Sequence, residues 1–222
     1  MSQYHPIPYK PKRIPTEQGI KTLIADLEIA QHRRSVRQFS TDPVPREMIE
    51  AAIQIAGTAP SGAHRQPWHF VAISNKEYKE ELRMATESEE KQFYEQRAPA
   101  EWLEALAPLG TDFIKEHITN APWVIIVFRR DYDILEDGTK LKNYYMTESV
   151  GIAVGFLLQA LHRAGLATLT HTPAPMTFLR DICGRPINEK PFVLIPVGYP
   201  SSNCQVPNLK RKTLEEISEF IT

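Results

Sequence analysis

The chain contains His32-Arg33-Arg34-Ser35-Val36-Arg37-Gln38-Phe39, in which three arginines and a serine fall within five residues. Arginine presents planar, permanently charged donors that suit bidentate phosphate binding, and serine adds a hydroxyl donor at short range. For a lone basic run, a solvated helix end is the common alternative. The run therefore predicts an anion site only if other segments of the chain support it.

Further segments do support it: Ala59-Pro60-Ser61-Gly62-Ala63-His64, Gln66-Pro67-Trp68, Gly198-Tyr199-Pro200 and Leu209-Lys210-Arg211-Lys212. Together they resemble the nitroreductase-type flavoprotein superfamily, and within it the iodotyrosine deiodinases with their soluble bacterial relatives. The arginine run and the Pro-Ser-x-x-x-x-x-Pro-Trp pattern are similar to nitroreductases in general. The segment 57–64, the acidic stretch with Glu90 and Tyr94, and Ile114-Lys115-Glu116 resemble the deiodinase substrate lid and its approach.

The pattern of apolar residues predicts an α+β fold. Helical spacing runs from Thr16, placed as an N-cap, to Ala30, again from Pro45 to Gly57, and over 149–164. Apolar or β-rich runs predict strands at 68–73, 123–128, 166–169 and 192–197. Few strands among irregularly placed helices, without G-x-G-x-x-G, argue against a doubly wound sheet. The resemblance implies a nitroreductase-like mixed β-sheet covered by helices, in an intertwined homodimer with FMN at the interface.

The domain boundaries follow from the prolines and the charged stretches. Four prolines within residues 1–15 predict an extended N-terminal arm, which lies on a partner subunit or is a disordered terminus. Residues 16–222 are predicted to form one FMN-binding domain. Its lid, about residues 87–109, is heavily charged and interrupted by Pro99, so we expect it to be mobile without substrate and ordered with it.

Composition limits the classes of partner. The net charge of −1 at 222 residues disfavours nucleic-acid binding. Cys183 and Cys204 show neither CxxC spacing nor a metal-ligand pattern, so we expect reduced thiols and no metal. The N-terminus lacks a signal-type apolar region and no run approaches a membrane span, so we expect a soluble, cytoplasmic protein without membrane contact. Animal deiodinases carry a membrane anchor, so only the chemistry of the resembled family is carried over.

The resemblance assigns the flavin-binding residues. It implies that Arg33, Arg34, Ser35, Val36 and Arg37 form the FMN site and share contacts to the phosphate and to the N1/O2 edge of the ring. A cation at that edge favours the reduced flavin, because reduction places negative charge there. Arg211 is implied as a further phosphate contact; alone, it would equally suit a basic surface turn.

Two short segments complete the implied cofactor site. Pro60, Ser61 and Gly62 have small side chains that let the backbone approach a flat ring, although an ordinary helix-to-strand turn has the same composition. Thr170, His171 and Thr172 end a predicted strand. In the deiodinases the last hydroxyl bonds flavin N5, which makes Thr172 the predicted catalytic residue and favours one-electron steps; a β-branched strand residue is the plain alternative. His171 is either a base or a backbone-bonded histidine.

The substrate site is predicted from three charged or polar side chains. Glu90 and Tyr94 are four positions apart in a helical pattern and share a face, and Lys115 comes from a later segment. The trio matches an amino-acid zwitterion, with Glu90 binding the α-ammonium and Lys115 and Tyr94 the α-carboxylate. The resemblance adds the backbone N–H of Ala63 as a donor to the substrate phenolate. A solvated charged helix is the alternative for Glu90 alone.

The predicted activity is FMN-dependent reductive removal of iodide, and of bromide or chloride, from 3-halotyrosines such as 3-iodotyrosine and 3,5-diiodotyrosine. The alternative is a general NAD(P)H-dependent nitroreductase or flavin reductase. A third reading, a non-enzymatic flavin-binding protein, leaves the trio without a purpose. The external reductant, NAD(P)H or a flavodoxin-type donor, is not identified by any motif.

Overall fold

The computed structural model describes residues 4–222. The chain divides into two units, Met1–Arg33 and Arg34–Thr222. In the first unit, residues 4–15 form neither helix nor strand and precede helix α1 (Thr16–Gln31). Residues 1–3 of the predicted arm lie outside the described part.

Both N-terminal helices begin directly after a proline. Pro15 is the N-cap of α1, with φ −57° and ψ 143°, so the expectation that Thr16 is the N-cap is wrong by one residue. Pro45 likewise caps α2 (Arg46–Gly57) instead of lying inside its first turn. A proline with extended ψ is the last residue of the preceding non-helical segment, and the helix begins with the next residue. No residue of α1 is buried within the described chain, and its apolar positions are exposed: Ile20, Leu23, Ile24 and Leu27.

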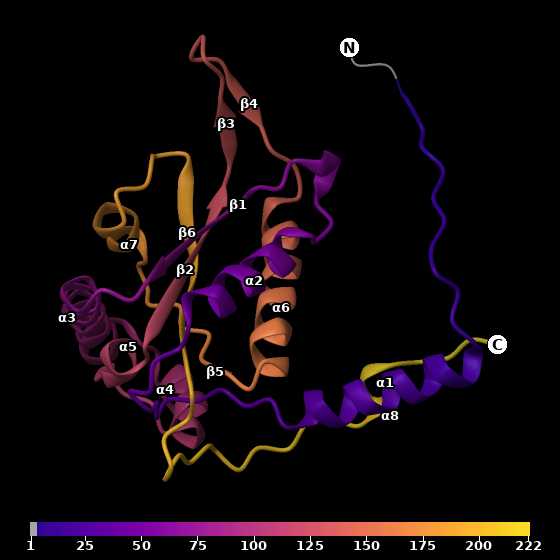
Figure 1. Ribbon diagram of the computed structural model, residues 1–222. Helices are drawn as coiled ribbons and strands as arrows, with labels where there is room; N and C mark the ends of the chain where they lie inside the picture. Colours follow the sequence, from indigo (N-terminus) through magenta and orange to yellow (C-terminus); the bar gives the residue numbers. More distant parts are fainter. Residues whose placement is uncertain (1–3) are drawn as a thin grey trace. The chain divides into compact units, whose positions relative to one another are not determined.

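The second unit is built on a four-stranded sheet (Figure 1). Its order is β1 (Trp68–Ile73), β2 (Trp123–Arg130), β6 (Glu189–Gly198), β5 (Ala167–Thr168), and every neighbouring pair is antiparallel. The mixed sheet implied by the resemblance is therefore an antiparallel one within the described strands. A parallel neighbour has to come from another segment, and Ser35 provides one as an isolated bridge to Thr168.

Helices cover both faces of the sheet. Helices α2 and α6 (Met146–Arg163) pack on one face with Ile125 and Val127 of β2. The other face carries Val124, Ile126 and Phe128 beneath α3 (Lys76–Gln92), α5 (Glu116–Asn120) and α7 (Thr177–Ile182). Strand β2 is continuously apolar because both of its faces are buried. Figure 1 shows this layering, which confirms the α+β class.

Helix α6 is covered on one side only. Val150, Leu157 and Leu161 are fully buried against the sheet, whereas Ile152 and Phe156 are about 40% exposed. A helix this apolar is typically covered on most sides. The single chain leaves the face with Ile152 and Phe156 uncovered.

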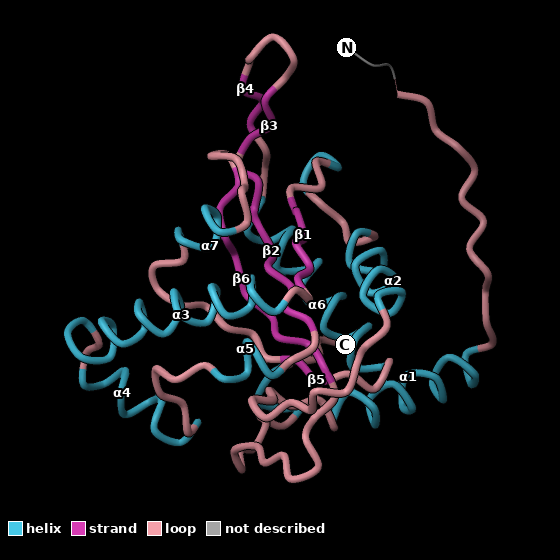
Figure 2. Tube along the Cα trace, turned by 60° about the vertical axis from the view of Figure 1, so that its left-hand side comes forward, coloured by secondary structure: helices cyan, strands magenta, loops and turns pink. Residues whose placement is uncertain are grey.

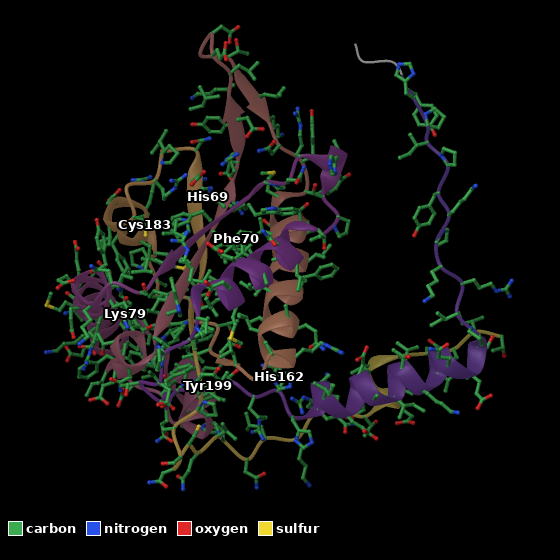
Figure 3. All side chains as sticks on the ribbon, viewed as in Figure 1. His69, Phe70, Lys79, His162, Cys183 and Tyr199 are labelled. Atoms are coloured by element: carbon green, nitrogen blue, oxygen red, sulfur yellow. The ribbon has the colours of Figure 1, made fainter. Side chains whose placement is uncertain are left out.

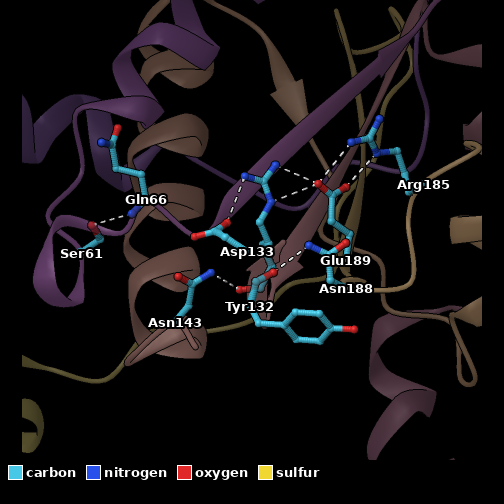
Figure 4. A network of polar contacts seen from close by, with 9 residues as sticks. Ser61, Gln66, Tyr132, Asp133, Asn143, Arg185, Asn188 and Glu189 are labelled. Atoms are coloured by element: carbon cyan, nitrogen blue, oxygen red, sulfur yellow. Dashed lines mark hydrogen bonds and ion pairs between the residues drawn. The ribbon is translucent and has the colours of Figure 1, made fainter. Parts of the chain in front are cut away.

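A short hairpin, β3 (Tyr132–Ile134) and β4 (Lys140–Lys142), extends beyond the sheet (Figure 2). Its base is held by a buried ion network, drawn in Figure 4. The Glu189 side chain is 1% exposed and pairs with Arg130 at 2.9 Å and Arg185 at 2.7 Å. Asn188 Nδ2 donates to the Tyr132 carbonyl at 2.7 Å.

The lid region is helical. After α3 the chain forms a π-helix (Phe93–Arg97), α4 (Ala100–Leu106) and a 3₁₀ turn (Ala107–Leu109). Lys79 of α3, labelled in Figure 3, is buried and donates from Nζ to the Ala121 carbonyl at 2.7 Å, which ties α3 to the end of α5. Near the C-terminus, α8 (Leu214–Ile217) begins with a Thr213–Glu216 capping box.

Two features that would indicate a membrane or a metal ion are absent from residues 4–222. None of the helices is both long and apolar enough to cross a bilayer. The same residues contain no cluster of three or more His, Cys, Asp or Glu side chains suited to a metal ion.

Candidate active site

A cavity of about 250 Å³ in the second unit gathers much of the predicted site. Its apolar wall comes from the lid, with Phe93, Trp102, Leu106 and Leu109. Seven residues predicted from the sequence line its polar part: Arg37, Glu90, Tyr94, Lys115, Thr170, His171 and Thr172. Segments far apart in the chain therefore meet at one place.

The centre of the polar wall is the Glu90 carboxylate, in the last turn of α3. Its Oε2 lies 2.6 Å from Lys115 Nζ, and its Oε1 lies 2.5 Å from His171 Nε2. Burial opposes ionisation of Glu90. The hydrogen bonds and charges of His171 and Lys115 outweigh burial and hold the pKa of Glu90 below its ordinary value.

Lys115 is held both through its backbone N–H and through its side-chain ammonium. It precedes α5 as the N-cap residue, and its backbone N–H donates to Glu87 Oε1 at 2.7 Å. Its ammonium, with the side chain 3% exposed, donates to the Asp112 carbonyl and lies 5.8 Å from the centre of the Tyr94 ring. A buried ammonium held by a carboxylate and a carbonyl is well placed to bind an anion in the cavity.

Tyr94 lies in the π-helix and completes the trio. Burial raises the pKa of its phenol, and the carboxylates of Glu90 and Asp112 act in the same direction. The phenol therefore stays protonated and can donate a hydrogen bond to a ligand carboxylate.

The segment 170–172 follows β5 and is tied to the sheet. His171 forms an antiparallel bridge with Leu194 of β6, with backbone hydrogen bonds of 2.8 and 2.9 Å. Thr170, His171 and Thr172 all line the cavity, and the His171 ring contacts Glu90.

The arginine run is only partly at the cavity. Arg37 lines it; burial lowers the pKa of Arg37, and its Nε is buried without a hydrogen-bond partner in the described chain. The Val36 N–H donates to the Thr168 carbonyl at 3.0 Å beside the Ser35 bridge. Arg34 donates to the Pro207 carbonyl. Arg33 ends the first unit, and Arg211 lies in the stretch before α8.

The segment 60–63 lies elsewhere in the second unit, near the start of α6, and does not line this cavity. The Gly62 N–H faces Ser149 Oγ at 3.3 Å, and a Cβ on Gly62 would lie 2.7 Å from the Tyr144 carbonyl oxygen. Ala63 has φ +49°, in the left-handed region. Only glycine fits at 62, and the next amide is held in a fixed, unusual direction.

Several residues at the cavity were not predicted. Asp112, Glu87 and Thr111 hold Lys115 and Tyr94, and His117 is buried edge-on to His171 with ring centres 5.4 Å apart. Asp112 could have been found, since its Oδ1 accepts the Ile114 N–H at 2.8 Å, a turn typical of Asp before a helix. His117 carries no sequence signal that separates it from a core residue.

Residues 30–199 match the nitroreductase family. The chain belongs to the nitroreductase family. An iodotyrosine deiodinase of Haliscomenobacter hydrossis is 51% identical over 93% of this chain and 93% of that protein. A Hydra vulgaris iodotyrosine deiodinase is 50% identical, covering 95% of this chain and 78% of that protein. The family resemblance predicted from the sequence is thus confirmed.

Solved members of the nitroreductase family agree with the fold. A crystal structure of oxidized iodotyrosine deiodinase bound to FMN and 3-iodo-L-tyrosine superposes with a TM-score of 0.73 at 30% identity, covering 89% of this chain and 99% of that chain. An FMN-bound nitroreductase of Bacteroides fragilis, 24% identical, has a TM-score of 0.63 over 89% and 98% of the two chains and shares the fold alone.

Proposed function

We propose that this protein is an FMN-dependent oxidoreductase that reductively removes halide from 3-halotyrosines, with 3-iodotyrosine and 3,5-diiodotyrosine as substrates and tyrosine and halide as products. The observation that carries this proposal is the meeting of Glu90, Tyr94 and Lys115 in one cavity that also contains Thr172. The relatives named iodotyrosine deiodinase, at 50–51% identity over most of the chain, support the same activity. Bromo- and chlorotyrosine are included because the trio binds the α-ammonium and the α-carboxylate of the substrate and not its halogen.

The trio fits the charged end of an amino acid. Glu90 is ionised and buried, so it binds the α-ammonium, while the Lys115 ammonium and the Tyr94 hydroxyl bind the α-carboxylate. Trp102 and Leu106 line the lid side of the cavity, where a bound ligand would lie against apolar side chains.

The remaining residues fit a flavin. Arg37 offers a buried N–H without a partner in residues 4–222, beside the hydroxyls of Thr170 and Thr172. These groups would hold the N1/O2 edge and N5 of FMN, with Arg33, Arg34, Ser35, Val36 and Arg211 at the phosphate. When bound, FMN supplies the electrons that break the carbon–halogen bond. Thr172 is the residue assigned to N5, and the protein's task is to hold the substrate ring flat against the flavin.

A homodimer is part of this proposal. Pro60, Ser61, Gly62 and Ala63 are assigned to the flavin ring and the substrate phenolate, yet they lie outside the cavity formed by the trio in one chain. A second copy would bring its 60–63 segment to that cavity. The exposed apolar residues of α1 and of α6 support such an interface. A cytoplasmic location, an extended arm over residues 1–15, and NAD(P)H or a flavodoxin-type protein as reductant belong to the same proposal.

The general nitroreductase alternative is less well supported. A nitroaromatic compound has no ammonium group, so the acceptor positions that Glu90 keeps beside Lys115 and His171 would have no ligand group to bind. The same argument applies to a protein that only stores flavin.

Halide release tests the proposal. Dithionite-reduced, FMN-loaded protein should release iodide from 3-iodotyrosine, and Glu90→Gln should reduce turnover at low substrate by about tenfold or more. Glu95→Gln is the matched control, since Glu95 lies on the same segment with its side chain 53% exposed. Wild-type protein that reduces nitroaromatics but releases no iodide would favour the alternative.

A further inference from the structure

Both oxygens of the Glu90 carboxylate are engaged by other segments of the chain. Lys115 reaches Oε2 from the loop before α5, and His171 reaches Oε1 from the segment after β5. The His171 and Glu90 side chains are 10% and 11% exposed, so this contact is shielded from water. A charge-assisted hydrogen bond of this length in a buried place is a strong one.

The two partners of Glu90 differ in how they are anchored. Lys115 belongs to a loop between helical segments, whereas His171 is hydrogen-bonded through its backbone in both directions to Leu194. Leu194 lies in β6, an inner strand of the sheet. His171 therefore connects the last turn of α3, where the lid begins, to the rigid core.

The surroundings of the His171 ring define which nitrogen donates. Its Nε2 faces the carboxylate, whereas its Nδ1 is buried without a hydrogen-bond partner in residues 4–222. His117 packs edge-on against it, and burial together with the charges of His171 and Lys115 lowers the pKa of His117 to about 3. The His117 ring is therefore neutral, and the contact with the Glu90 carboxylate places a proton on His171 Nε2.

We propose that His171 is a positioning residue for ligand recognition: it donates Nε2–H to Glu90 Oε1 and so keeps the carboxylate ionised and aimed at a ligand's α-ammonium. This inference rests on the proposed function. It gives His171 a contact distinct from the flavin contact predicted for it. A carboxylate has about four lone-pair positions, so the bonds to His171 and Lys115 leave room for the ammonium.

Two variants separate this role from simple packing. His171→Gln places an amide N–H near the position of Nε2, whereas the shorter His171→Asn cannot reach Glu90. Both are polar and both leave the backbone bridge to Leu194 in place. His117→Phe is the matched control, since it changes the neighbouring ring without touching Glu90.

The measurement is the dissociation constant of the FMN holoenzyme for each of two ligands, obtained from the change in flavin fluorescence at neutral pH. The first ligand is 3-iodotyrosine, and the second is 3-(4-hydroxy-3-iodophenyl)propanoate, which lacks the ammonium. His171→Asn should weaken 3-iodotyrosine binding about tenfold and change binding of the propanoate less than about twofold. His171→Gln should restore most of the loss, and His117→Phe should leave both constants unchanged.

A pH profile gives a second readout. In acid, 3-iodotyrosine binding, measured relative to 2-iodophenol, falls as Glu90 is protonated, and His171→Asn should move the midpoint of that fall to higher pH. Wild type and His171→Asn share the other titratable groups that face this cluster: Lys115, Tyr94, His117, Arg37, Arg83 and Asp112.

The outcomes are distinct. Equal weakening of both ligands in His171→Asn, or an unmoved pH midpoint, overturns the positioning role. Unchanged binding of 3-iodotyrosine overturns it as well. If the wild-type holoenzyme does not bind 3-iodotyrosine, the proposed function itself is overturned. If the wild type binds 3-iodotyrosine and His171→Asn binds it equally well, only the positioning role is overturned.

Discussion

At the scale of single residues, the pair Glu90–Lys115 combines two tasks. Both side chains are nearly inaccessible, at 11% and 3% exposure, so each charge depends on the other for stability as well as for ligand binding. Removing one partner from a buried pair leaves the other charge unpaired, which costs more than the pair contributes.

A double-mutant cycle tests this dependence. Glu90→Gln and Lys115→Met should each lower the free energy of unfolding by about 3 kcal/mol, because each breaks the buried ion pair and leaves the remaining group only its second contact, to the Asp112 carbonyl or to His171. The double variant should lose less than the sum of the two. Urea unfolding provides the measurement, and Glu95→Gln, at an exposed site, should stay within about 0.5 kcal/mol of wild type. Strictly additive losses would contradict the coupling.

The lowered pKa of Glu90 makes stability depend on pH. In the unfolded chain Glu90 titrates near its ordinary value of 4.5, and in the folded protein it titrates below that value. The unfolded state therefore binds more protons in this range, so the stabilisation is present above 4.5 and is lost as pH falls through the folded pKa. The difference in unfolding free energy between wild type and Glu90→Gln should shrink on acidification. A difference that stays constant from neutral pH into this range would argue against it.

The site was predictable in part. Glu90, Tyr94 and Lys115 could be selected because their residue types and spacing fit the resembled family, and the structure brings them together with Thr172. The bond from His171 to Glu90 could not be predicted, since it joins positions 81 apart and depends on how α3 meets the segment after β5. The assigned flavin roles stay predictions.

At the scale of elements, we expect the order of the lid to depend on a ligand. It is attached through Glu90 and through Arg97, which donates to the Glu89 and Ala174 carbonyls at 3.1 and 3.3 Å. Trp102 and Leu103 of α4 remain 53% and 37% exposed. Few buried apolar contacts hold such a segment, so local opening costs little.

Limited trypsin digestion of the FMN holoenzyme tests the lid. Without ligand, cleavage after Lys91 and Arg97 should be fast, and 3-iodotyrosine should slow it several-fold because the ligand joins Glu90, Tyr94 and Lys115. Cleavage after Lys140, on the exposed hairpin, serves as the internal control and should not change. Equal cutting of the lid in both states would show that no ligand-dependent ordering occurs.

The elements themselves were predictable where burial was strong. Strands β1, β2 and β6 were anticipated because they carry apolar runs that the core covers. The hairpin β3–β4 was missed because its three-residue strands are charged and partly exposed, so they lack an apolar pattern. Helix α1 begins one residue earlier than expected, because Pro15 with its extended ψ takes the N-cap position that the sequence assigned to Thr16.

At the scale of the whole molecule, the proposed homodimer explains exposed apolar surface that the single chain leaves uncovered. Light scattering after gel filtration should give a mass of about twice 25.3 kDa. Leu23, 71% exposed on α1, should be buried by the second copy, so Leu23→Glu should shift the protein toward the monomer and lower its FMN content. Leu23→Met, which keeps an apolar side chain, should remain dimeric. A monomeric wild type that retains FMN would refute the shared site.

Glu90, Tyr94 and Lys115 lie on three different segments, namely α3, the π-helix and the loop before α5, and this placement has a stereochemical consequence. One acidic and two donor groups around an α-carbon, with the ligand ring held against the proposed flavin, define a handed receptor. The mirror-image ligand can satisfy only part of it at a time. D-3-iodotyrosine should therefore show a larger dissociation constant than the L-enantiomer, and a racemate should be consumed to about half.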